Sequence, residues 1–409
     1  MSIDKVEIIN LSFFIQKNAL EGVLIMAKPF VKWAGGKEKE LNIILKHLPA
    51  DIDNYYEPFV GGGAVYFAMQ DLKINGTKFI NDKSFELISL YNNIANNNKT
   101  FFDYLNKIND NWNLLSDIVK NNENDLLDFY YNYKRGNYNL VQLKDAINTF
   151  ILNHHDDFNG MLNDDFNIQI DDFYIEIVNA LKRKIKRVKQ LEGENDFGKE
   201  NILENIETAF KSAFYTHFRR LYNERSRNKE LAEVITEEKA SSIFYFIREF
   251  CYASMFRYNK RGDFNVPYGG MAYNNKSFIT KINQIENKEY QKYIMDSVIK
   301  NEDFEDFVRE NAPQTGDFIF LDPPYDTEFS EYAKNSFGRE DQIRLAEFLY
   351  KTPAKFMLVI KATPFIKSLY EDKGFNIVDF NKKYMVNFQN RNTRDVIHLI
   401  ITNYEKGEN

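Results

Sequence analysis

The sequence predicts an α/β protein whose mostly parallel sheet is interrupted by a long, mainly helical insertion. Strand and helix patterns alternate in residues 26–98 and again in residues 310–405, as expected for a parallel sheet with helical crossovers. Residues 99–309 show helical patterns up to Cys251, followed by a predicted hairpin over residues 257–270. We therefore expect one discontinuous α/β domain with a second domain inserted into it.

The first block of the α/β part is Phe30–Lys37. Apolar residues at helical spacing follow it, and Pro49 ends the predicted helix. The Gly36-Lys37 pair superficially resembles a phosphate-binding loop. Glu38 stands where that loop needs a Ser or Thr for magnesium, and its earlier glycine is missing, so the sequence excludes a nucleoside triphosphatase.

The next block, Tyr55–Ala64, predicts a short strand, a glycine turn and the start of a helix, which is the usual entry to a nucleotide pocket. Asp82 follows the next strand and can accept both hydroxyls of a ribose. Gly61 and Gly63 fit the first two positions of a dinucleotide fingerprint, but Tyr66 occupies the third. The pattern therefore favours a nucleoside cofactor without phosphates, for which S-adenosylmethionine is the candidate.

Residues Asp322–Tyr325 follow the apolar strand Phe318–Leu321 directly. The two prolines fix φ and remove two N–H donors, so this turn presents hydrogen-bond acceptors. Asp322 and the carbonyl of Pro323 can each accept one N–H of a planar amine, while Tyr325 stacks on its ring. The alternative is an ordinary strand that ends in a proline turn.

In their order, these segments resemble the Dam-type, D12-class DNA adenine N6-methyltransferases. The similar blocks are residues 32–37, 57–67, 81–92, 257–269, 321–326 and 329–345, with a weaker block at 390–404. The resemblance implies a Rossmann-like S-adenosylmethionine-dependent methyltransferase fold with an inserted, mainly helical target-recognition domain. Two features depart from the family: Lys361-Ala362-Thr363 replaces the usual small polar residues after a strand, and the recognition region is longer than in compact relatives.

The resemblance also implies roles for individual residues. Those expected to contact the cofactor are Trp33, Lys37, Phe59, Gly61, Gly63, Asp82 and Asp322. Those expected to hold a flipped-out adenine are Asp322, Pro323 and Tyr325, and those expected to contact DNA are Arg257, Tyr258, Asn259 and Arg261.

We therefore expect site-specific transfer of a methyl group from S-adenosylmethionine to adenine N6 in duplex DNA, at a short palindrome of the GATC type. The expected partners are double-stranded DNA and a cognate restriction endonuclease, with the enzyme itself a monomer. The alternatives are an RNA or protein-amide methyltransferase and a catalytically silent DNA-binding relative. Each would use the same acceptor turn or the same DNA-binding region.

Composition supports a folded globular protein, with 409 residues, 44% hydrophobic content and 36 Phe. The single cysteine, Cys251, excludes an internal disulfide and a thiolate zinc cluster, and the lack of a proline before it argues against a cytosine C5-methyltransferase. His154–Asp157 could bind metal or could be a polar helix end, and we expect no metal.

The net charge of −7 argues against a nucleic-acid partner, but the positive charges are clustered. Three basic runs lie in the insertion, at 182–189, 219–227 and 257–261, and each is either a DNA contact or a solvated helix face.

No stretch reaches 18 apolar residues, so no transmembrane helix is expected. Residues 1–25 lack the pattern of a signal peptide, and Met26 is a candidate alternative start. From the absence of these two patterns we expect a cytoplasmic protein. The richness in Asn, Lys and Ile fits an AT-rich genome, so we expect a bacterial or phage origin.

Overall fold

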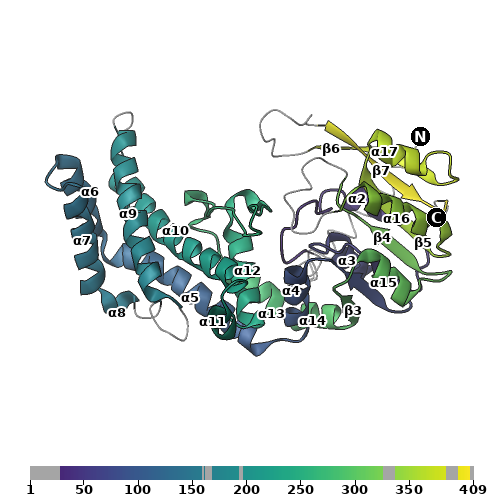
Figure 1. Cartoon of the computed structure of the whole chain (residues 1–409), viewed down its shortest axis with the longest axis horizontal. Coiled ribbons are helices and arrows are strands. Elements are labelled where there is room, and N and C mark those ends of the chain that lie inside the picture. The colour runs from purple at the N-terminus through teal and green to yellow at the C-terminus, as the bar shows by residue number, and fades with distance from the viewer. Residues whose placement is uncertain are drawn as a thin grey trace, which may run out of the picture. The chain divides into compact units, whose positions relative to one another are not determined.

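The computed structural model describes residues 28–158, 161, 168–192, 197–325, 337–383 and 395–405. The described residues divide into two compact units, one within Met1–Asn96 and Gln284–Asn409 and the other within Asn97–Asn283 (Figure 1). The N-terminal extension, Met26, and parts of the blocks at 321–326, 329–345 and 390–404 lie outside the described residues.

The first unit is built on a seven-stranded sheet in the order β3-β2-β1-β4-β5-β7-β6. Its strands are β1 (Tyr55–Glu57), β2 (Lys78–Asn81), β3 (Ser297–Lys300), β4 (Phe318–Leu321), β5 (Lys355–Lys361), β6 (Asn376–Lys383) and β7 (Asp395–Thr402). Strands β1 to β5 pair in parallel, whereas β7 runs antiparallel to both β5 and β6. The prediction of an α/β protein with a mostly parallel sheet is confirmed.

Helices cover this sheet. They are α2 (Leu41–Ile44), α3 (Ala64–Ala68), α4 (Phe85–Ala95), α14 (Lys288–Met295), α15 (Phe304–Asn311), α16 (Arg339–Lys351) and α17 (Pro364–Tyr370), with the 3-10 turns η2 (Leu45–His47) and η3 (Met69–Asp71). The helix expected before Pro49 corresponds to α2 and η2.

The core of the first unit lies around β4 and β5. All four residues of β4 are buried, as its continuous apolar run predicts for a central parallel strand. Side chains of β4, β5, α15, α16 and α17 form one apolar cluster. After β5, Thr363 caps α17 by accepting a hydrogen bond from the Ile366 N–H at 3.2 Å, so the unusual Lys361-Ala362-Thr363 segment ends a strand and starts a helix.

The boundary of the insertion differs from the expected one. We expected the insertion to run over residues 99–309, but the second compact unit ends at Asn283. The reason is that β3 pairs in parallel with β2, from Ser297 opposite Lys78 to Lys300 opposite Asn81, and so belongs to the sheet. Helix α13 (Ile279–Glu286) crosses the boundary between the units along the chain.

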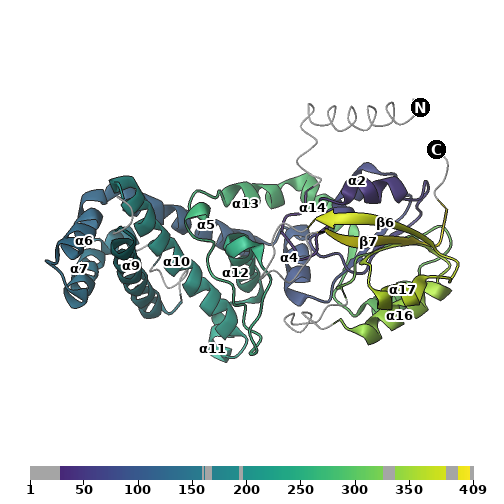
Figure 2. The ribbon, with the colours of Figure 1, turned by 90° about the horizontal axis from the view of Figure 1, so that it is seen from above.

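The second unit is mainly helical up to Cys251, as the sequence predicts. Its helices are α5 (Lys99–Asn121), α6 (Glu123–Arg135), α7 (Leu140–Asn153), α8 (His155–Phe158), α9 (Ile170–Glu192), α10 (Lys199–Arg225), α11 (Lys229–Val234) and α12 (Glu237–Phe250), followed by η4 (Tyr252–Ser254) and η5 (Met271–Tyr273). Trp112 of α5 is buried against aromatic side chains of α10 and α12. Helices α9 and α10 lie side by side (Figure 2). Within the described ranges, no helix is long and apolar enough to cross a membrane.

Candidate active site

Three predicted site turns lie at one edge of the sheet. The glycine turn follows β1, Asp82 follows β2 and Asp322 follows β4, and these three strands are neighbours in the sheet. Because they are parallel, their carboxyl ends meet at the edge where open α/β sheets bind ligands. The structure thus brings together segments that lie more than 200 residues apart in the chain.

The glycine turn packs tightly against aromatic side chains. Gly61 and Gly63 have φ values of +51° and +77°, which side chains disfavour. A Cβ atom at Gly61 would lie 2.9 Å from the Trp33 ring, and one at Gly63 would lie 2.5 Å from the Tyr91 hydroxyl. Trp33 therefore lies against the turn, as expected, and both glycines are needed for this close approach.

The backbone N–H groups of the glycine turn bond within the protein. The Gly61 N–H donates to Asp82 Oδ2 at 3.0 Å, and the Gly63 N–H donates to the Val60 carbonyl at 2.8 Å. In a dinucleotide site such groups point at the pyrophosphate. Here they have protein acceptors, which favours a ligand without phosphates.

Asp82 is a partly buried carboxylate held by two backbone bonds. Besides Gly61, the Ser84 N–H donates to its Oδ1 at 2.9 Å. Burial raises the pKa of Asp82 to about 6, against the opposing effect of the two N–H donors. Each carboxylate oxygen has a second lone pair, so Asp82 can still accept hydroxyl donors from a ligand.

Lys37 links the first block to the acceptor turn. Its side chain is 2% exposed, and its ammonium forms an ion pair with Asp322. It also donates to the Gly35 carbonyl at 2.9 Å and to the Tyr325 hydroxyl at 3.0 Å. These partners match the three donors of an ammonium group. Lys37 was expected to contact the cofactor, and in the structure it holds the side chains of the acceptor turn.

The acceptor turn has further supports that the sequence did not reveal. The amide Nε2 of buried Gln342 on α16 donates to the Pro324 carbonyl at 2.9 Å. The half-buried Tyr325 ring meets His398 of β7 edge to face, at 5.3 Å between ring centroids. A glutamine in a helix and a histidine in a strand carry no signal for such roles in a single sequence.

Glu57 adds a second carboxyl group beside the site. It is 2% exposed and accepts a hydrogen bond from the Tyr55 hydroxyl at 2.6 Å. Burial raises the pKa of Glu57 well above its usual value, and although the Tyr55 bond lowers it, the charges of Asp322 and Asp82 raise it further. The raised pKa favours the neutral form of Glu57, which limits negative charge beside the two aspartates.

Phe59, an expected cofactor contact, lies in an aromatic wall. Its ring centroid is 5.6 Å from that of Phe304 and 5.4 Å from that of Phe337, edge to face in the second case. Pro323 is buried.

The described residues contain no group of three or more His, Cys, Asp or Glu side chains placed to hold a metal ion.

The expected hairpin is present in the second unit. Tyr258 pairs with Phe264 and Cys251 pairs with Tyr268 in antiparallel bridges. Asn259, an expected DNA contact, builds the turn instead, because its Oδ1 accepts from the N–H groups of Arg261 at 2.9 Å and Asp263 at 3.0 Å. Asn259 therefore shapes the segment that carries Arg261.

Tyr258 does not lie where a DNA contact would need it. We expected Tyr258 to contact DNA, but its side chain is 5% exposed and packs against Phe256 and Phe264. Its position makes it a core residue of the hairpin. The Arg257 guanidinium is exposed and donates to the Asn265 carbonyl at 2.7 Å across the hairpin, and Arg261 is also exposed.

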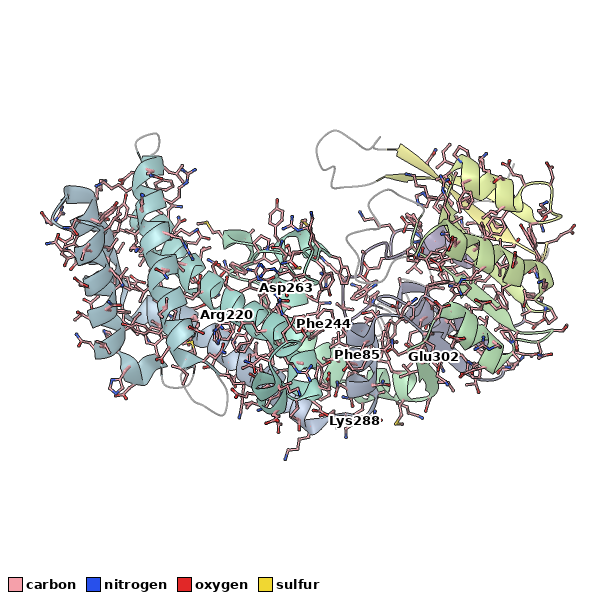
Figure 3. All side chains as sticks on the ribbon, in the orientation of Figure 1. Phe85, Arg220, Phe244, Asp263, Lys288 and Glu302 are labelled. Atoms are coloured by element: carbon pink, nitrogen blue, oxygen red, sulfur yellow. The ribbon has the colours of Figure 1, made fainter. Side chains whose placement is uncertain are left out.

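Helix α10 supports the hairpin through the second basic run and its neighbours. The Asn223 side chain bonds both the N–H and the carbonyl of Phe264, at 2.8 and 3.1 Å. Arg219 donates to the Val266 carbonyl at 2.8 Å, and Arg227, just after the end of α10, pairs with Asp263. Asp263 is labelled in Figure 3. These two arginines therefore hold the hairpin, a role that neither sequence-based interpretation of this basic run, as a DNA contact or as a solvated helix face, describes.

Comparison with known proteins identifies the family to which the chain belongs. A model of the family described as D12 class N6 adenine-specific DNA methyltransferase matches residues 33–184 and 163–386. The chain belongs to this family, and it is a DNA adenine N6-methyltransferase.

Several relatives cover almost the whole chain. The type II methyltransferase M.CviBI of Paramecium bursaria Chlorella virus NC1A is 27% identical over 380 residues, which is 92% of this chain and 100% of the relative. The type II methyltransferase M.MjaIII of Methanocaldococcus jannaschii is 28% identical over 392 residues, covering 92% of this chain and 99% of the relative. A shorter match is to a DNA adenine methylase of Vibrio cholerae, which is 27% identical over 171 residues, covering 40% of this chain and 59% of the relative.

Proposed function

We propose that the chain methylates adenine N6 at a specific site in duplex DNA with S-adenosylmethionine as donor, and that residues Asp322–Tyr325 hold the target amine. The first unit is then a Rossmann-like S-adenosylmethionine-dependent domain, and the second unit is the inserted target-recognition domain. The observation that carries this proposal is the ion pair of buried Lys37 with Asp322, at the sheet edge shared with Asp82.

The residues after β1 and β2 fit this cofactor. S-adenosylmethionine has a ribose diol but no phosphate, and it supplies a methyl group on a sulfonium that is open to direct in-line displacement. Asp82 offers carboxylate lone pairs to the diol, while Gly61 and Gly63 keep their N–H groups bonded within the protein. Trp33, packed on the turn, forms an apolar wall for the same site.

The acceptor turn orients the amine and takes no proton from it before attack. As the N–CH3 bond forms and the S–CH3 bond breaks, the methylated nitrogen becomes acidic and gives its proton to the Asp322 carboxylate or to water. The Asp322 carboxylate, held by Lys37, accepts one N–H of the amine, and the Pro323 carbonyl accepts the other. The carboxylate is too weak a base to deprotonate a neutral amine before attack, so its role is orientation and polarisation. Tyr325 stacks on the adenine, which helps to offset the few kcal/mol that extruding a base costs.

The proposal is tested by incubating duplex DNA with the full chain and methyl-labelled S-adenosylmethionine, followed by digestion to nucleosides. We expect the label in N6-methyladenine. Label in N4-methylcytosine, in RNA or in protein instead would contradict the proposal.

Asp82 is expected to make cofactor binding depend on pH. Ionised Asp82 is the better acceptor for the ribose hydroxyls, so the dissociation constant of S-adenosylmethionine should rise as pH falls through about 6, by up to about tenfold per pH unit. Because the folded-state pKa of Asp82 is raised, protonation of this group stabilises the fold as pH falls, so unfolding through Asp82 does not explain the loss.

Calorimetry with S-adenosylmethionine on either side of pH 6 checks this expectation. Asp82→Ala should weaken binding by roughly 1.5–3 kcal/mol and remove the pH dependence. Asp71→Ala, which removes an exposed carboxylate from η3 of the same unit, is the matched control. Unchanged binding of S-adenosylmethionine by Asp82→Ala would show that another residue contacts the ribose.

Arg261 is expected to read a base. It is exposed on the hairpin turn built by Asn259, and a guanidinium there can bond guanine O6 and N7. Arg261→Ala should relax the choice at one position of a short palindrome of the GATC type, with about 1–3 kcal/mol of discrimination lost. Methylation of a randomised duplex library measures this, with exposed Lys260→Ala as control. A uniform loss across all sequences in Arg261→Ala would make Arg261 a phosphate contact.

We also propose that the enzyme acts as a monomer beside a cognate restriction endonuclease. The support is that the viral and archaeal relatives are named type II methyltransferases. An expressing host whose DNA resists a restriction enzyme of the same site specificity would support this role.

A further inference from the structure

We propose that one face of α9, formed by Lys182, Arg183, Lys186 and Arg187, binds the phosphate backbone of duplex DNA outside the recognised sequence. We call this surface the α9 basic face. The inference rests on the proposed function and assigns a role to part of the long insertion.

The charge of α9 is strongly asymmetric. Between Leu181 and Leu191 there are six Lys or Arg residues and no Asp or Glu, in a chain whose net charge is −7. The acidic residues of the helix lie in its first half, at Asp171, Asp172 and Glu176, and at its last residue. The second half of α9 is therefore a local positive surface on an acidic protein.

Packing separates the six cations into two groups. Lys184 is partly buried, and Lys189 donates to the Tyr133 carbonyl of α6 at 2.9 Å, so these two are engaged with the helical unit. The other four form the α9 basic face. Arg183 remains 65% exposed although it bonds Glu176 at 2.7 Å, Lys186 and Arg187 are exposed, and Lys182 is partly buried.

Helix stability does not account for this face. Lys182 with Lys186 and Arg183 with Arg187 are like-charged pairs at i,i+4 spacing, each of which destabilises a helix. The helix dipole favours cations only in the last turn, which accounts for Lys189 and not for the four residues of the face. A polyanion bound across the face would remove the repulsion.

The second basic run, at residues 219–227 on α10 and just after it, differs from the α9 basic face. There Arg219 and Arg227 bond the hairpin, and Arg225 pairs with Glu237 at 2.6 Å. Because α9 packs along the same α10 that holds the hairpin, one helix supports both the predicted base-reading turn and the α9 basic face (Figures 1 and 2).

Duplex DNA is the occupant that these observations favour. Lys and Arg side chains that neutralise phosphates bind without regard to sequence and release counterions, which makes affinity fall with salt. Contacts of this kind raise affinity for DNA that extends beyond the recognised sequence, and they leave the choice of base to the hairpin.

The test compares Lys186→Ala/Arg187→Ala with wild type, and Lys120→Ala/Lys144→Ala, which removes two exposed cations from α5 and α7, is the matched control. Binding is measured against salt for a duplex that holds only the recognised sequence and for a longer duplex with flanks. For the longer duplex, the slope of log affinity against log salt should decrease by about 0.9 per lost phosphate contact in the first variant only. The methylation rate at saturating DNA should not change.

A salt slope equal to that of the control, or an equal loss on both duplexes, would overturn the inference. Failure of the proposed function is distinguishable, because the wild-type protein would then produce no N6-methyladenine on either duplex.

Discussion

Asp322→Ala is expected to reduce methyl transfer by about 10²–10³-fold or more, while DNA affinity is largely retained. In the proposed function the carboxylate accepts one N–H of the target amine at the reacting centre, and losing a preorganised group of this kind costs about that factor. Labelled-methyl incorporation into duplex DNA measures the loss. Activity within about tenfold of wild type would contradict the role of Asp322.

Two controls accompany Asp322→Ala. Removing the carboxylate leaves Lys37 as a buried cation, so thermal unfolding must show that the variant is folded at the assay temperature. Asp306→Ala removes a half-exposed carboxylate from α15, where it pairs with Arg309, and should leave activity unchanged.

Lys37→Met is expected to lower the rate of the methyl-transfer step by about 10²-fold while changing the dissociation constant of S-adenosylmethionine little. The ammonium holds Asp322 and Tyr325, so its loss frees both side chains that face the adenine. It also leaves the Asp322 carboxylate without its partner, which should lower the free energy of unfolding by about 3 kcal/mol, at the lower end for broken buried pairs because Asp322 is 17% exposed.

Single-turnover kinetics and cofactor titration separate the two roles of Lys37. A rate loss at saturating cofactor indicates positioning of the acceptor turn. A dissociation constant that rises by as much as the rate falls would restore the expected role of Lys37 as a cofactor contact. Lys37→Arg, which keeps the charge but not the shape, should recover part of the rate.

Much of the fold follows from local sequence signals. The apolar run of β4 predicts a central strand, and the glycine and Asp-Pro-Pro-Tyr turns predict where ligands meet the sheet. The boundary of the insertion was missed because β3, with the sequence Ser-Val-Ile-Lys, is short and only partly buried at the edge of the sheet. Such a strand has no apolar run to mark it, and only its pairing with β2 reveals it.

The candidate site, like the fold, has residues that local motifs reveal and contacts that only the folded structure reveals. Trp33, Asp82 and Asp322 were found because their motifs carry them, but the bonds of Lys37 to Asp322 and Tyr325 connect positions nearly 290 residues apart. No local pattern predicts such a pairing. Tyr258 was misplaced because adjacent residues of a hairpin point to opposite faces, and the sequence does not show which face is buried.

The most direct test of the account is a double-mutant cycle on the single-turnover rate constant for methyl transfer, with Asp322→Ala, Lys37→Met and the double variant. If Lys37 acts mainly by holding the Asp322 carboxylate, the double variant should lose much less than the product of the two single losses, because after Asp322→Ala only the bond of Lys37 to Tyr325 remains to be lost. A double variant whose loss is the product of the two single losses would show that the residues act independently, and would contradict the account.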